Sequence, residues 1–307
     1  MAAMSEETYG LREMMTVTVE FTFNSCFDTE MYFLLPFARN IMLTDASLIY
    51  PFPSIESFIP NWIEENLTSA LAMEWRSALV SFFVKKEFST QEAVLVGSGF
   101  LYLIDDKMPC IITASHVITE MRKSDLPFIS IDGVKFLFEN LEIFFNNEQD
   151  YAVIPLPEKI AMAIPNSKLF TSFNNTREIK TSSFVIIGYP AKHNKLHRLR
   201  PDRGLTPFAL TFHNFHYDWL TEDIFFYFIP DGKKKNIIFE PNSFTRSIPS
   251  LAGMSGGVIA QIVISRDNGL YSLRAIGSFK EHRAKRGHFL VGATFVDFSN
   301  ELKELCK

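Results

Sequence analysis

A serine between glycines, directly before a β-branched run, constrains this chain more than any other stretch. It reads Leu251-Ala252-Gly253-Met254-Ser255-Gly256-Gly257-Val258-Ile259. The flanking glycines leave room for another backbone beside the Ser255 hydroxyl, and Gly253 can turn backbone N–H groups toward a developing negative charge. A serine hydroxyl is a weak nucleophile unless a base, itself held by a third group, takes its proton. Without those partners the stretch could equally be an ordinary turn.

Two upstream segments supply a candidate base and a candidate acid. Thr113-Ala114-Ser115-His116-Val117 closes one apolar run, and Asp150-Tyr151-Ala152-Val153-Ile154 opens another. In the order His, Asp, Ser, the three segments resemble the chymotrypsin-like (trypsin-fold) serine peptidases over about residues 78–300, in their compact form without zymogen activation. Gly188-Tyr189-Pro190 resembles a further segment of that family.

The resemblance implies a role for each motif residue. His116 would be the general base, Asp150 would orient its imidazole, and Ser255 would attack the acyl carbon. The backbone N–H groups of Gly253 and Ser255 would form the oxyanion hole, and no cofactor or metal is expected. The motif also fits the serine elbow of α/β-hydrolases. That fold requires a helix after the serine, with the acid and the histidine later in the chain. Here the run after Ser255 is β-branched and strand-like, and only 307 − 255 = 52 residues follow the serine, so we reject this alternative.

The body of the chain is rich in short strand-like runs with turn signals between them. One group covers about residues 78–157, with a Gly97-Ser98-Gly99 step expected to divide its early strands and a strand expected over 128–138, and it ends with the run after Asp150. A second group covers about 183–296 and includes strands expected over 206–216 and 236–240. This pattern predicts an all-β fold of two packed antiparallel β-barrels, as in trypsin, forming one peptidase domain over residues 78–296. His116 and Asp150 then lie in the first barrel and Ser255 in the second. Their meeting place would be the cleft between the barrels.

Both ends lie outside the predicted barrels. Residues 297–307 are expected to form a C-terminal helix. Residues 1–77 are expected to be an α+β extension, with a strand over 15–23 and a helix from Asn61 to Arg76. We expect this extension to pack on the first barrel; a regulatory partner binding through residues 1–77 is the alternative.

Composition excludes several classes of function. A chain of 307 residues with 47% hydrophobic residues and a net charge of −5 has no excess of basic charge for nucleic acid. No apolar run is long enough for a membrane span, and the first residues do not read as a signal peptide. Three widely spaced cysteines make no disulfide framework, which favours a cytoplasmic protein.

Substrate contacts are predicted from the resemblance alone. Pro249 would lie at the base of the primary specificity pocket, where its lack of charge disfavours cleavage after Arg or Lys. Nearby candidates are Lys280, Glu281 and His282, although a solvated loop over 280–286 is the simpler interpretation. Met254 stands where digestive relatives carry the aspartate that pairs with a new amino terminus. We therefore expect the intact chain to be active without proteolytic maturation.

His193 and His197 have the spacing of two metal ligands, but their surroundings resemble a loop and lack the glutamate of a zinc-peptidase helix, so no metal site is expected. Together these features predict a serine endopeptidase that takes a protein or peptide substrate. The alternatives are a trypsin-fold binding or scaffold protein with weak catalysis, and an esterase on the same fold.

Overall fold

The three-dimensional structure is a computed structural model of the 307-residue chain. It describes residues 57, 59, 61–85, 93–104, 108–139, 141–163, 169–171, 177–195, 204–213, 215–218, 221, 223–227, 250–283 and 289–294. Within α2 and α4, introduced below, the side chains of residues 61–65, 159, 162 and 163 are not described. All of these residues belong to the unit Pro51–Lys307. The expected strands over 15–23 and 236–240, Pro249 and the C-terminal helix lie outside them.

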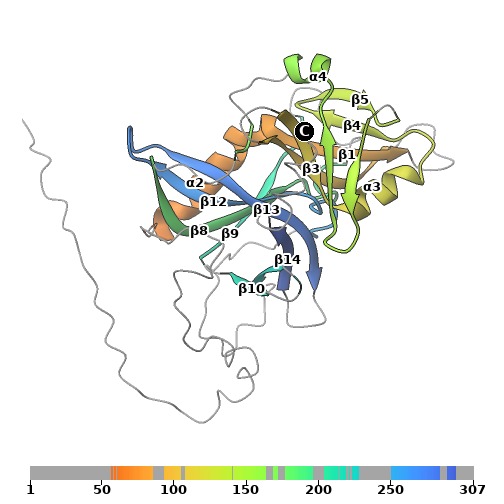
Figure 1. The fold of residues 1–307 in the computed structure, drawn as a ribbon. Helices are drawn as coiled ribbons and strands as arrows, with labels where there is room; N and C mark the ends of the chain where they lie inside the picture. The colour runs from red at the N-terminus through yellow and green to blue at the C-terminus, as the bar shows by residue number, and fades with distance from the viewer. Residues whose placement is uncertain are drawn as a thin grey trace, which may run out of the picture. The chain divides into compact units, whose positions relative to one another are not determined.

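The first sheet has seven antiparallel strands in the order β5-β4-β1-β2-β3-β7-β6 (Figure 1). The strands are β1 (Leu79–Lys85), β2 (Ala93–Ile104), β3 (Met108–Thr113), β4 (Phe128–Ile131), β5 (Val134–Leu137), β6 (Phe144–Asn146) and β7 (Tyr151–Pro155). Helix α3 (Ser115–Arg122) follows β3, and α4 (Glu158–Ala163) follows β7.

The second sheet also has seven antiparallel strands, in the order β10-β11-β14-β13-β12-β8-β9. They are β8 (Glu178–Gly188), β9 (Phe208–Phe212), β10 (His216–Asp218), β11 (Asp223–Tyr227), β12 (Val258–Ser265), β13 (Tyr271–Arg283) and β14 (Phe289–Thr294). The predicted all-β class with two antiparallel sheets is confirmed. Among the described strands, the end strands of neither sheet pair with each other, so closed barrels are not seen.

Alternate residues of β1 pack into two different hydrophobic cores. Val80 and Phe82 pack inside the first sheet's own core, whereas Leu79 and Phe83 belong to a second core. That second core also holds Ile187 and other side chains of β8, β12 and β13, so it joins the two sheets. Because successive strand residues point to opposite faces, a period-two apolar run can line both cores at once.

The helix expected over Asn61–Arg76 is present as α2 (Asn61–Glu74) followed by the 3-10 turn η2 (Trp75–Ala78). It contacts both sheets. Thr68 Oγ1 hydrogen-bonds to Thr211 Oγ1 of β9 at 2.8 Å. Trp75 stacks on Phe170, with ring centroids 4.4 Å apart, and Phe170 pairs with Tyr102 of β2.

Two local predictions are wrong in their boundaries. The run expected as one strand over 128–138 is a hairpin, β4 and β5, because Asp132 and Gly133 turn the chain with positive φ. The strand expected over 206–216 is likewise two strands, β9 and β10. Helix α3 was not predicted, and it begins one residue before His116.

Candidate active site

His116 and Asp150 meet at the start of α3. Helix α3 begins after Ala114, whose side chain cannot cap it, and Asp150 at the entrance to β7 takes that role. Its Oδ1 accepts the His116 backbone N–H at 3.0 Å and the Ser115 hydroxyl at 2.8 Å. A carboxylate is favoured there because a helix N-terminus presents unpaired N–H groups and partial positive charge.

The same carboxylate orients the imidazole. His116 Nδ1 lies 2.8 Å from Asp150 Oδ2 and 3.1 Å from Oδ1. With Nδ1–H donating to Asp150, Nε2 of the neutral ring is left as the acceptor, which is the tautomer a general base requires. Asp150 reaches this position with a φ of +53°, a left-handed conformation that aspartate tolerates better than most residues.

The two groups shift each other's pKa. The hydrogen bond that His116 donates to Asp150 raises the pKa of His116, against the effect of burial, and the charges of Asp150, Glu281 and Glu120 raise it further. Burial alone would raise the pKa of Asp150, but the hydrogen bond and charge of His116 outweigh it and hold that pKa below its usual value. The pair therefore favours an ionised Asp150 beside a readily protonated His116.

The Ser255 loop lies directly against the residues that precede α3. The Ser98 N–H of β2 donates to the Ser255 carbonyl oxygen at 2.8 Å. Gly256 has a φ of +83°, and a Cβ there would collide with the Ser98 carbonyl and Thr113 Oγ1 and lie 2.8 Å from the Ala114 nitrogen. Only glycine permits this approach. It places the chain after Ser255 two residues from His116, although the two residues come from different sheets.

Two backbone N–H groups of this loop are held in position without partners. Ala191 N–H donates to the Ala252 carbonyl at 2.7 Å, and Gly257 N–H donates to the Met254 carbonyl at 2.8 Å. Because the C=O and N–H of a trans peptide point in opposite directions, these bonds aim the N–H groups of Gly253 and Ser255 the other way. Within the described part of the chain, neither N–H donates a hydrogen bond.

Ser98 supports this arrangement and was not singled out by sequence reasoning as a functional residue. Its hydroxyl donates to the Gly253 carbonyl at 2.7 Å and accepts the Tyr189 N–H at 2.8 Å, and the residue is fully buried. The expected Gly97-Ser98-Gly99 step lies inside β2 instead. A serine between glycines in a strand was the available signal, since small residues mark close backbone approach. Ser115, beside Asp150, was also missed.

Strand β13 passes the serine loop and then has an open side. Phe279 N–H donates to the Gly257 carbonyl at 2.8 Å, and its carbonyl accepts the Gly256 N–H at 2.7 Å. Pairing between β12 and β13 ends at Val258 and Ser278. Among the described strands, β13 beyond Phe279 therefore pairs only with β14, through Glu281, His282 and Arg283.

The predicted substrate contacts occupy different environments. Lys280 is buried, and its ammonium donates to Asp223 at 2.5 Å, so the solvated loop expected from residue 280 is wrong for this side chain. Glu281 is exposed, bonds to Arg283 Nε at 2.5 Å, and is close enough to raise the pKa of His116. His282 lies in β13, half-buried. Pro249 lies outside the described residues.

Met254 is fully buried among the apolar side chains of the second sheet, between the two N–H groups that flank it. Its side chain thus anchors the loop by packing. Among the described residues, no group of three or more His, Cys, Asp or Glu side chains could hold a metal ion, and His197 lies outside them. His193 is exposed in a turn.

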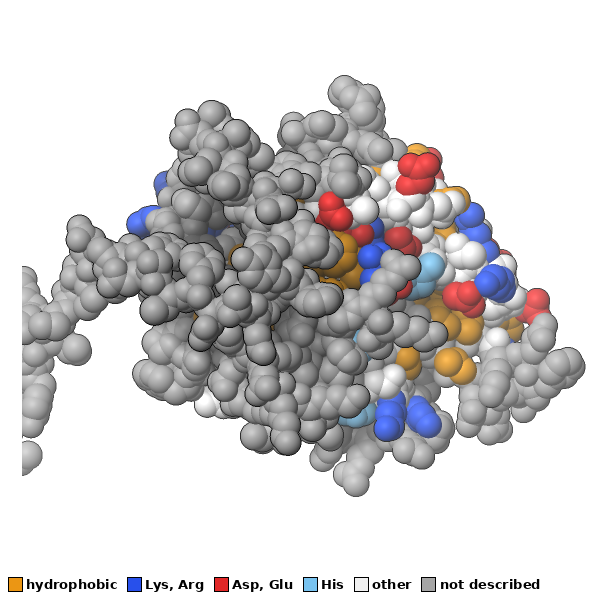
Figure 2. Space-filling model, turned by 90° about the horizontal axis from the view of Figure 1, so that it is seen from below, with side chains coloured by type: hydrophobic (Ala, Val, Ile, Leu, Met, Phe, Trp, Pro, Cys, Tyr) orange, Lys and Arg blue, Asp and Glu red, His pale blue; other side chains and the backbone are white. Residues whose placement is uncertain are grey.

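On the face seen in Figure 2, acidic and basic side chains lie near one another around apolar ones rather than in areas of a single charge. None of the helices that the structure describes is long and apolar enough to cross a membrane.

No protein-family model and no curated protein matches the chain. Solved structures do match. The serine protease domain of the Sesbania mosaic virus polyprotein is 16% identical, with a TM-score of 0.40, over 73% of this chain and 91% of its own. The active form of the Rv3671c protease from M. tuberculosis is 13% identical, with a TM-score of 0.42, over 83% and 93%.

The protease Anisep from Arthrobacter nicotinovorans is 13% identical, with a TM-score of 0.42, over 75% of this chain and 96% of its own. At these identities and scores the likeness carries no argument about chemistry, which has to come from the residues of the chain itself. These three solved structures are chymotrypsin-like serine proteases.

Proposed function

We propose that the protein is a serine endopeptidase that cleaves peptide bonds through an acyl-enzyme on Ser255. The observation that carries this proposal is the pair of N–H groups on Gly253 and Ser255, which donate to no group among the described residues, in a loop packed against the segment before His116. Gly253 is buried and Ser255 half-buried, so leaving these two donors unbonded gives up hydrogen-bond energy, which a bound oxyanion would restore. A purely structural turn has no reason to keep them unpaired.

In the proposed reaction His116 Nε2 takes the Ser255 hydroxyl proton as the oxygen attacks the substrate carbonyl carbon. The oxygen of the tetrahedral intermediate accepts hydrogen bonds from the Gly253 and Ser255 N–H groups. Protonated His116 then gives its proton to the leaving amine as the C–N bond breaks. Water, deprotonated by the same imidazole, attacks the acyl-enzyme and releases the acid and Ser255.

Asp150 stabilises the imidazolium that forms during each step, in keeping with the raised pKa of His116. In the described structure the His116 side chain hydrogen-bonds only to Asp150. The bond between His116 Nε2 and the Ser255 hydroxyl therefore forms when substrate binds, as is common for catalytic contacts.

The open side of β13 favours a peptide substrate over a simple ester. Beyond Phe279 the strand pairs, among the described strands, with β14 alone, and an extended chain could add along its other edge as a further strand. A small ester has no backbone to pair there. The esterase alternative therefore predicts no advantage for longer substrates, whereas the endopeptidase predicts that kcat/KM rises as residues are added on the acyl side.

The test is labelling by a fluorophosphonate, with mass spectrometry to locate the labelled residue. We expect labelling at Ser255, none in Ser255→Ala, and normal labelling in the matched control Ser265→Ala, which changes a serine of β12 remote from the motif. Turnover of a peptide substrate should fall by about 10⁶ in Ser255→Ala, as for nucleophile loss in another serine protease. Unlabelled wild-type protein that still binds peptides would favour the scaffold alternative and refute the proposal.

A further inference from the structure

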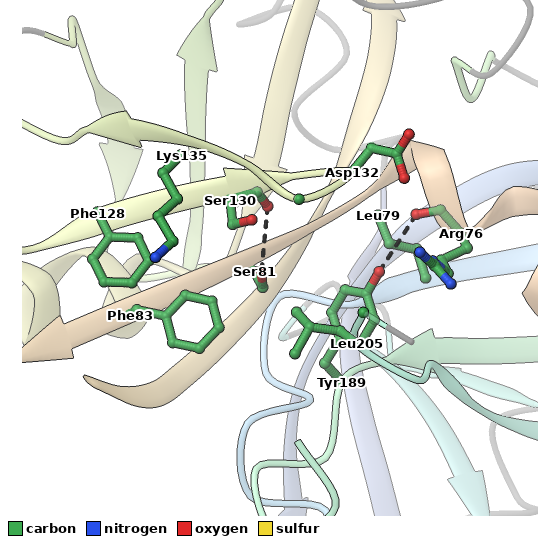
Figure 3. A pocket seen from close by; sticks show the side chains of 12 residues that line it. Arg76, Leu79, Ser81, Phe83, Phe128, Ser130, Asp132, Lys135, Tyr189 and Leu205 are labelled. Carbon is green, nitrogen blue, oxygen red and sulfur yellow. Dashed lines mark hydrogen bonds between the residues drawn. The ribbon is translucent and has the colours of Figure 1, made fainter. Parts of the chain in front are cut away.

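A pocket lies between the outer face of the first sheet and residues that come between β8 and β9 in the chain (Figure 3). Its volume is about 150 Å³, and none of His116, Asp150 and Ser255 lines it. The first sheet contributes residues of β1, β4, β5 and the turn between β4 and β5, η2 contributes Arg76, and the segment after β8 contributes Tyr189, Gly204 and Leu205. The pocket is thus separate from the proposed active site.

One part of the pocket is apolar and flat. Phe83 of β1 and Phe128 of β4 stack there, with ring centroids 4.9 Å apart and planes 12° from parallel. Leu79 and Leu205 complete the apolar lining. Phe83 itself is only 1% exposed, so the half-buried Phe128 ring is the aromatic surface that can take another flat apolar group.

Charge is distributed unevenly around these rings. Lys135 Nζ lies 5.2 Å from the centroid of the Phe128 ring, and Figure 3 shows it at the end of the pocket away from Asp132 and Arg76. Asp132 and Arg76, which carry opposite charges, line the other end of the pocket. Within the described part of the chain Lys135 forms no ion pair, which leaves a cation at the Phe128 end.

The size of the pocket limits what it can take. Sites for drug-sized ligands are commonly about 300–1,000 Å³, so this one suits a single small ring with a short polar arm. The ring would pack on Phe128 and Leu205, which are both half-buried, and a carboxylate on the arm would meet Lys135. The hydroxyl of Ser130, which neighbours Lys135 across the hairpin, could donate to the same carboxylate.

The wall formed by Tyr189 continues into the support of the serine loop. The Tyr189 phenol is neutral because burial raises its pKa, and its hydroxyl donates to the Arg76 carbonyl at 3.4 Å. Its N–H donates to Ser98 Oγ, which in turn donates to the Gly253 carbonyl. Two residues on, Ala191 N–H holds the peptide that bears the Gly253 N–H.

We propose that this pocket is an effector site for a small carboxylic acid bearing one flat apolar group, and that its occupancy acts on the Gly253 N–H through residues 189–191. The binding half is independent of the proposed peptidase activity. The coupling half concerns the position of a backbone N–H, which can be observed without any turnover. Failure of the effector site and failure of the proposed function are therefore distinguishable.

The binding experiment titrates the full-length protein with phenylacetate, and with phenylacetamide as the neutral match, followed by ligand-observed NMR. Because phenylacetate is small, the protein should bind it with a Kd of about a millimolar, and it should bind the amide more weakly. Lys135→Gln should weaken phenylacetate binding about fivefold, because an exposed charge pair contributes little more. Lys123→Gln, an exposed lysine outside the pocket, is the matched control and should change nothing.

The coupling experiment uses a property of the sequence. Ala–Gly occurs once in the chain, at Ala252–Gly253. Protein labelled with carbonyl-¹³C alanine and ¹⁵N glycine therefore gives one HNCO signal, from the Gly253 N–H itself. We expect this signal to move saturably with phenylacetate at the same Kd as binding, and to move far less in Lys135→Gln at equal ligand concentration.

Each outcome decides one half of the proposal. Absent binding, equal binding of the acid and the amide, or unchanged binding in Lys135→Gln would overturn the effector site. Binding that depends on Lys135 while the Gly253 signal stays fixed would overturn the coupling through residues 189–191.

Discussion

Replacing Ser98 by alanine tests the support of the serine loop. The Ser98 hydroxyl is buried and bonds two backbone groups, the Gly253 carbonyl at 2.7 Å and the Tyr189 N–H at 2.8 Å. Removing it leaves both unsatisfied, and each buried orphan costs about 1–3 kcal/mol. We therefore expect Ser98→Ala to lower the free energy of unfolding by about 2–5 kcal/mol.

The structure offers a matched control in Ser183. It is also fully buried, but among the described residues its hydroxyl has no hydrogen-bond partner, so Ser183→Ala removes an unsatisfied group and should be close to neutral. Urea titrations followed by tryptophan fluorescence give both free energies. Equal effects of the two substitutions would refute the reasoning from Ser98.

A second readout of the same variant concerns the loop. Because Ser98 holds the carbonyl side of Gly253, Ser98→Ala should also slow fluorophosphonate labelling of Ser255. We expect a loss of about tenfold, less than the 10²–10³ that removal of an oxyanion donor costs elsewhere, since both N–H groups remain. Labelling at the wild-type rate would show that the loop holds its position without Ser98.

Three further predictions follow from burial and charge. His116 must be neutral to act as base, and Glu281 raises its pKa, so kcat/KM should fall as the pH drops through that raised pKa. Glu281→Gln should move this fall to lower pH. An unmoved pH profile would contradict the prediction. Trp75→Ala should cost about 3–5 kcal/mol of unfolding free energy, measured against Met73→Ala on the exposed side of α2, which should cost under about 0.5 kcal/mol. The fully buried Met254 side chain anchors the serine loop by packing, so the uncut chain should label with fluorophosphonate as purified. Met254→Asp, which would bury a charge there, should not label. Labelling only after a cut near residue 77 would refute this.

Local patterns in the sequence determined the class of the fold and the residue types of the candidate site. Period-two runs such as 79–84 mark strands because alternate residues face opposite sides, and that geometry holds whatever the partner strand is. The types His, Asp and Ser carry their chemistry with them. For the same reason the spacing of Leu67 and Leu71 was enough to predict the helix α2.

Only the tertiary structure decided how these residues are held. Ala114 cannot cap α3, and the cap comes from Asp150, the residue before β7. The hydroxyl of Ser98 finds its partners across the two sheets, and Lys280 is buried because Asp223 lies beside it. Each of these contacts joins residues far apart in the chain. A residue's sequence neighbours do not specify such a partner, so the packing of the two sheets had to be known first.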